Sequence, residues 1–131
     1  AFEWYLKAAN QHNITSQFWI GSFYEEGQGT KKDLSKAMEW YLKAAEQGSA
    51  GAQDSIGEMY ENGRGVKQDY DKAMEWFLKA ANGGRASSQN QVGLMYQQGK
   101  GVPQDSSKAM EWFLKAAEQS YPAAQFNIGF L

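Results

Sequence analysis

The sequence predicts an all-α protein built as an array of helix pairs, an α-solenoid. A motif that reads EWYLKAA or EWFLKAA begins at Glu3, Glu39, Glu75 and Glu111, so it returns every 36 residues. Segments 36–71 and 72–107 share 20 identities over 36 aligned positions. Each period contains two stretches whose apolar residues recur at helical spacing. Repeats of this length are typical of solenoids, in which each unit packs only on its neighbours.

The motif marks the second helix of each unit, helix B, which we expect near residues 1–10, 34–46, 70–82 and 106–118. Its apolar residues fall at i, i+3, i+4, i+7 and i+8 and form one stripe, as in Ala73, Trp76, Phe77, Ala80 and Ala81. The tryptophans that recur with this stripe are therefore expected in the core: Trp4, Trp40, Trp76 and Trp112. Glutamate and lysine four residues apart, as in Glu75 and Lys79, are expected to pair on the solvent edge.

The first helix of each unit, helix A, is expected near residues 14–26, 50–62, 86–98 and 122–131. Asp33, Asp69 and Asp105 directly precede helix B, where a carboxylate can accept hydrogen bonds from the free backbone amides. Paired glycines such as Gly63 and Gly65 follow helix A. A phosphate-binding loop would follow a strand and carry further signature residues, so these glycines predict a left-handed helix end and a turn.

Composition excludes several classes of function. The net charge of −2 and the isoelectric point of about 5.4 disfavour nucleic acid and membrane surfaces, which attract clustered lysine and arginine. The chain has no cysteine, and His12 is its one histidine. Disulfides, thiolate nucleophiles and zinc clusters are thereby excluded, and no metal or cofactor is expected. His12 lies where the next unit has Gly48 and is expected to be a solvated turn residue.

Residues 50–81 resemble the Sel1-like repeat, a relative of the tetratricopeptide repeat, and the resemblance extends over essentially the whole chain. It rests on Ala50, Ala52, Gln53, Ile56, Gly57, Tyr60, Gly63, Gly65, Val66, Asp69, Lys72, Ala73, Trp76, Lys79, Ala80 and Ala81. The resemblance implies antiparallel helix pairs stacked in a right-handed superhelix, with helices A on the concave face. It also implies a non-catalytic adaptor or scaffold that binds proteins. One subgroup of the family is stapled by cysteines, and this chain, without cysteine, departs from it.

The period divides residues 1–131 into one array of five units. These are 1–13, with helix B alone, then 14–49, 50–85 and 86–121, and finally 122–131, with part of helix A. Solenoids normally carry polar end units, and none is visible here, so we expect a fragment of a longer array. Uncovered ends also predict that copies can associate head to tail.

The resemblance places a partner in the concave groove, lined by the helix A positions that vary between units. The expected partner-binding residues are Phe18, Ser22, Glu25, Asp54, Glu58, Glu61, Asn90, Leu94 and Gln97. The four carboxylates among them favour a basic or polar peptide. A solvated face of a passive spacer is an alternative. An enzyme or metal site is another, although carboxylates on one helix point outward in parallel and lack the converging ligands that such a site needs.

Phe18 and Trp19 are aromatic where the following units carry polar residues. Exposed aromatic residues are effective anchors for a protein partner. Alternatively, Trp19 packs against the aromatic residues of the first helix, Phe2, Trp4 and Tyr5.

Overall fold

The computed structural model describes residues 1–119 and 121–129, which form eight α-helices and no strand. These are α1 (Phe2–Asn10), α2 (Ile14–Glu26), α3 (Leu34–Glu46), α4 (Ala50–Asn62), α5 (Tyr70–Asn82), α6 (Ala86–Gln98), α7 (Ser106–Ala117) and α8 (Pro122–Ile128). They confirm the expected helices to within a few residues. The last part of the final helix A, with Phe130 and Leu131, lies outside the described residues.

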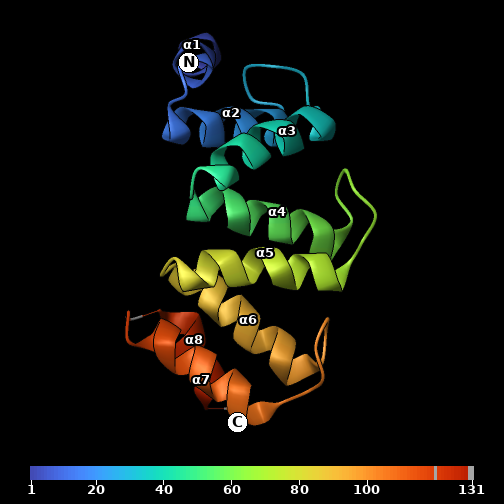
Figure 1. Ribbon diagram of the computed structural model, residues 1–131, viewed down its shortest axis with the longest axis vertical. Helices are drawn as coiled ribbons and strands as arrows, with labels where there is room; N and C mark the ends of the chain where they lie inside the picture. Colours follow the sequence, from blue (N-terminus) through green and yellow to red (C-terminus); the bar gives the residue numbers. More distant parts are fainter. Residues whose placement is uncertain (120, 130–131) are drawn as a thin grey trace.

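The helices stack in chain order into a solenoid, and each packs mainly on its neighbours in sequence (Figure 1). Helices α2, α4, α6 and α8 are the A helices, and α1, α3, α5 and α7 are the B helices. Within a unit, as for α4 and α5 in Figure 1, the two helices run antiparallel and are joined by a long loop. Within the described residues, no helix has the length and apolar character that a membrane span requires.

The periodic glycine of helix A allows the aromatic residue of helix B to pack directly on its backbone. Phe77 of α5 is fully buried, and a Cβ atom placed on Gly57 of α4 would lie 2.8 Å from its ring. The same pair recurs as Gly21 with Tyr41. This close approach explains why the two positions repeat together, since a larger residue at the glycine would displace the ring.

Polar residues that recur with the period satisfy the helix ends. The carboxylates of Asp33, Asp69 and Asp105 accept hydrogen bonds from Lys36, Lys72 and Lys108 amides at 3.0–3.1 Å, which confirms the predicted caps. Gly27, Gly63 and Gly99 end the A helices in the left-handed conformation, as expected. The amides of Gln17, Gln53 and Gln89 donate to the last carbonyls of the preceding helix B, at Ala9, Ala45 and Ala81.

The periodic tryptophans were predicted to lie in the core, and they lie instead at its margin, where Trp76 and Trp112 pack against the buried residues while partly exposed. Trp4 is 78% exposed, and the equivalent Trp40 and Trp76 are only partly buried. The Nζ atom of Lys79 lies 4.1 Å from the centre of the Trp76 ring, and this lysine has no ion pair with Glu75. A cation over an indole face gains electrostatic attraction, so the lysine three residues later covers Trp40, Trp76 and Trp112 on the surface.

Candidate binding surface on the A helices

The A helices are joined to one another by polar side chains at the positions that vary between units. Three hydrogen bonds connect them: Ser88 Oγ with Asp54 Oδ1 at 2.6 Å, Gln91 Nε2 with Glu61 Oε2 at 2.7 Å, and Asn127 Nδ2 with Asn90 Oδ1 at 3.0 Å. An ion pair of 3.4 Å joins Glu25 Oε2 of α2 to Arg64 Nε in the loop after α4. The surface is thus a continuous layer across α2, α4, α6 and α8.

Four predicted site residues gather on this layer into one acidic cluster, formed by Glu25, Asp54, Glu58 and Glu61. Glu58 lies among the other three carboxylates and, within the described residues, has neither a hydrogen bond nor an ion pair. The remaining three are each held by a neighbouring side chain. Glu58 is therefore the carboxylate of the four that no neighbouring side chain holds.

Burial and charge raise the pKa of Glu58 to about 7. The largest cause is the reduced hydration of the carboxylate on this surface, although the residue stays accessible to solvent. The negative charges of Asp54, Glu25 and Glu61 raise it further. Arg85 opposes them with its positive charge. A second cation brought by a partner would stabilise the ionised form in the same way.

Two of the predicted partner-binding residues, Asp54 and Asn90, are buried and do not face solvent. Asp54 is 7% exposed, so the expectation that its carboxylate points outward is wrong, and Asn90 is likewise buried at 6% exposure. Burial raises the pKa of the Asp54 carboxyl, while the hydrogen bond from Ser88 and the charge of Arg85 lower it. Both residues join neighbouring A helices, and this contact requires them to be small and polar.

The other predicted residues are partly accessible. Glu25 accepts a hydrogen bond from the buried Tyr41 hydroxyl at 2.7 Å, and burial followed by this carboxylate raises the pKa of Tyr41. Ser22 lies beside the same hydroxyl. Leu94 and Gln97 continue the surface along α6, half-buried.

Sequence reasoning missed the two arginines of this surface, Arg64 and Arg85. The Nε atom of Arg85 lies 3.9 Å from Asp54 Oδ2. Arg85 occupies the N-cap position of α6, where Asn13 and Ser49 cap the preceding A helices, and it makes no capping hydrogen bond. Arginine is a poor N-cap residue, and Arg85 appears one unit after Asp54, an aspartate that the other units lack at this position. This combination could have indicated the Arg85–Asp54 pair from the sequence.

The aromatic residues of α2 are divided between core and surface. Phe2 and Tyr5 pack on Phe23, with ring centres 6.3 and 5.4 Å apart. Trp19 is 42% exposed, and its ring contacts Phe18 and Phe23 of its own helix. Trp19 and the half-buried Phe18 leave aromatic surface at this end of the layer.

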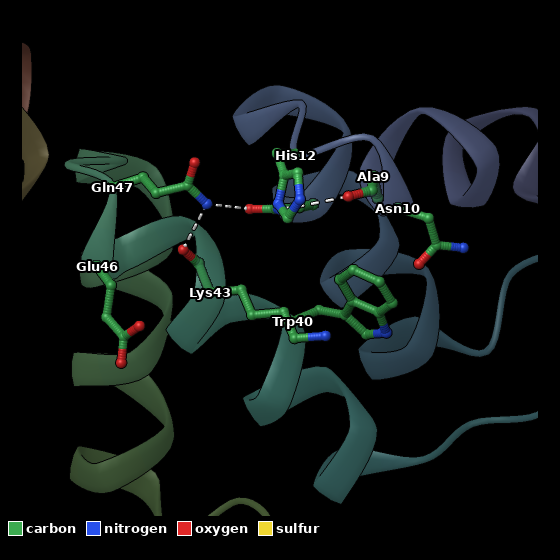
Figure 2. Close-up of a pocket in the computed structure, with 8 residues that line it drawn as sticks. Ala9, Asn10, His12, Trp40, Lys43, Glu46 and Gln47 are labelled. Carbon is green, nitrogen blue, oxygen red and sulfur yellow. Dashed lines mark hydrogen bonds between the residues drawn. The ribbon is translucent and has the colours of Figure 1, made fainter.

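A depression of about 280 Å³ lies at the junction of α1, α2 and α3 (Figure 2). Its polar side chains hold neighbouring helices together and do not converge on one ligand position. Its Gln47 amide donates to Gln17 Oε1 at 2.7 Å and to the carbonyl of Lys43 at 3.0 Å. Lys43 in turn covers the Trp40 ring at 4.1 Å. His12, in the turn beside them, is exposed as expected, with a φ of 66° where Gly48 has 92°.

Replacement of Glu58 by glutamine should raise the melting temperature at pH 8 and leave it unchanged at pH 4. The folded pKa of about 7 lies above the ordinary 4.5, so the folded chain holds this proton more tightly than the unfolded chain. Stability from this group is therefore lost as the pH rises between these two values. Thermal denaturation across this range is the measurement, with Glu75→Gln on the exposed side of α5 as control. Equal effects of both variants at pH 8 would contradict the assignment.

Comparison with known families finds one repeat model along the chain. The model of the Sel1 repeat matches residues 1–13, 14–49, 50–84 and 86–121. A comparison with curated protein sequences found no significant match.

Solved structures of Sel1 repeat proteins superimpose closely on the chain. A Sel1 repeat protein from Oxalobacter formigenes is 36% identical with a TM-score of 0.93, covering 98% of this chain and 52% of its own. The antigen c5321 of uropathogenic Escherichia coli strains, which displays an SLR fold, is 39% identical with a TM-score of 0.93, covering 95% and 27%. Cysteine rich protein B of Helicobacter pylori is 26% identical with a TM-score of 0.75, covering 96% and 94%.

The chain thus spans about half or less of the first two of these proteins. Proteins built from Sel1 repeats are generally protein-interaction scaffolds and are typically not catalytic. The repeat matches cover most of the sequence, and the chain belongs to the Sel1 repeat family.

Proposed function

We propose that this chain is a non-catalytic scaffold that binds a basic or polar protein segment in the groove lined by its A helices. The observation that carries the proposal is the acidic cluster with its unpaired carboxylate, Glu58. The fold stacks the A helices one after another, and an extended segment can lie across them. A lysine or arginine of that segment would pair with Glu58 and relieve the repulsion within the cluster.

An enzyme that uses these carboxylates is less well supported, because acid–base chemistry needs side chains free to reach one substrate atom. Glu25, Asp54 and Glu61 are each engaged by a side chain of a neighbouring helix or loop. Among the residues described, no three histidine, cysteine or carboxylate side chains are grouped to hold a metal ion. These engagements favour binding over catalysis.

Head-to-tail association of copies is a further part of the proposal. Phe2 and Tyr5 are packed on α2 and do not form the outer surface of α1. Trp4, 78% exposed, occupies that surface, and Phe126 of α8, 67% exposed, lies at the other end. An A helix at one end and a B helix at the other could pair as α6 and α7 do, by a heterologous contact.

The proposal is tested with a fluorescent peptide of alternating lysine and serine, measured by anisotropy. We expect weak binding that falls as salt rises from about 0.02 to about 0.15 M, since exposed charges are screened over this range. Glu58→Lys should reduce the affinity about tenfold, because it removes the unpaired carboxylate and places a like charge opposite the peptide.

Glu75→Lys is the matched control, because it makes the same change in net charge on the exposed edge of α5. It should leave the affinity near that of the original chain. No binding at low salt, or equal losses in the two variants, would leave the groove without a role and favour a passive spacer.

A further inference from the structure

A cleft of about 370 Å³ opens where α2 and α4 begin, next to the acidic cluster. Its lining includes the apolar Ile14 and Phe18 of α2, Gly51 of α4 and Arg85 from the turn before α6, together with Thr15, Gln47, Gly48 and Ser49. Ile14 is 37% exposed, and Phe18 is half-buried. The cleft thus offers apolar surface that the fold itself leaves open to solvent.

The absence of a side chain at position 51 leaves the floor of this cleft open. The equivalent positions of the other units carry Thr15, Ser87 and Ala123. A Cβ atom on Gly51 would meet Phe18 Cε1 at 3.4 Å and Arg85 Nη1 at 3.7 Å, which are ordinary contact distances. Packing therefore does not require glycine here, and glycine weakens a helix relative to alanine.

The charges around the cleft determine what could occupy it. Arg85 is directed to Asp54 through Nε, at 3.9 Å, and its guanidinium lies over Gly51, where it can donate hydrogen bonds to backbone carbonyls. Gly51 and Glu58 are seven residues apart and lie on the same side of α4, about 10 Å along the helix axis. An extended chain covers that distance in about three residues.

We propose that this cleft is an anchor site that takes one apolar side chain of an extended protein segment whose lysine or arginine, about three positions away, pairs with Glu58. The inference rests on the proposed binding function and specifies its partner. Unpaired negative charge at one end and uncovered apolar surface at the other match a segment of this composition.

The test uses Gly/Ser decapeptides that carry one lysine and one leucine, three positions apart, with anisotropy as the readout. Replacing the leucine by serine should weaken binding about tenfold, since burial of such a side chain is the main gain at the cleft. Gly51→Leu should weaken binding of the leucine peptide by a similar factor, because the new side chain fills the cleft. It should not weaken binding of the alternating lysine and serine peptide, which lacks an anchor.

Ser87→Leu, the same substitution one unit later, is the matched control and should leave both affinities unchanged. Gly51→Leu should fold, since leucine has the higher helix propensity, and Gly51→Ala should give a smaller loss of binding. The anchor site is overturned if the leucine peptide binds Gly51→Leu as tightly as the original chain, or if replacing the peptide's leucine by serine does not weaken binding. In both cases the lysine and serine peptide should still bind. Failure of that peptide as well overturns the proposed function itself.

Discussion

Replacement of Gly93 by alanine should destabilise the fold by about 3 kcal/mol, because the added methyl group overpacks a rigid contact. A Cβ atom at this position would lie 2.5 Å from Phe113 Cε1 and 3.2 Å from the carbonyl oxygen of Ala109. The Phe113 ring is fully buried, so it must shift within the packed core to make room. Urea unfolding monitored by circular dichroism measures the effect.

Gly51→Ala is the control for this substitution, since it also adds one methyl group to an A helix. There the new atom makes only ordinary contacts. Its higher helix propensity should stabilise the fold by about 0.5–1 kcal/mol. Opposite signs for the two variants are expected, and equal losses would mean that the glycine–aromatic contact does not determine the spacing between A and B helices.

Replacement of Ser88 by alanine should cost about 1.5–3 kcal/mol near neutral pH, the usual range for a hydrogen bond to a charged group. The Ser88 hydroxyl donates to the buried Asp54 carboxylate at 2.6 Å. Without it the carboxylate keeps only the more distant Arg85, at 3.9 Å. Denaturant unfolding at several pH values is the measurement.

The cost of Ser88→Ala should grow with pH. Burial already raises the pKa of Asp54, so its ionisation lowers stability as the pH rises above the ordinary value of 3.8. Loss of the donor raises that pKa further and makes the decline steeper. Ser87→Ala, on the adjacent half-buried serine, should cost little. A cost independent of pH would show that Ser88 acts by packing alone.

Most of the fold was predictable because the same local chemistry recurs in each unit. Asp69 before helix B and Gly63 after helix A specify the ends of helices by short-range hydrogen bonds and backbone conformation. The period then places Gly57 and Phe77 in the same relation in successive units. Each of these features depends on residues close in sequence or repeated at a fixed distance.

The candidate site was less predictable because its contacts join residues of different units that occur once. Asp54 with Ser88 and Glu25 with Arg64 are 34 and 39 positions apart, and neither pair repeats along the chain. Periodicity identifies such positions as variable but does not distinguish an exposed carboxylate from a buried one. The position of the tryptophans was hard to predict for a related reason. An apolar stripe does not show which of its residues lie at an edge where a lysine can cover them.

The groove assignment is tested most directly by nuclear magnetic resonance titration of the isotopically labelled chain with the leucine–lysine decapeptide. We expect the shifted backbone amides to lie on helices A, around Gly51 and Glu58 on α4 and along the facing turns of α2 and α6. Amides on the exposed edges of α3, α5 and α7 should remain unchanged. Shifts concentrated on those B helices, or scattered evenly over the surface, would contradict a binding groove on the A helices.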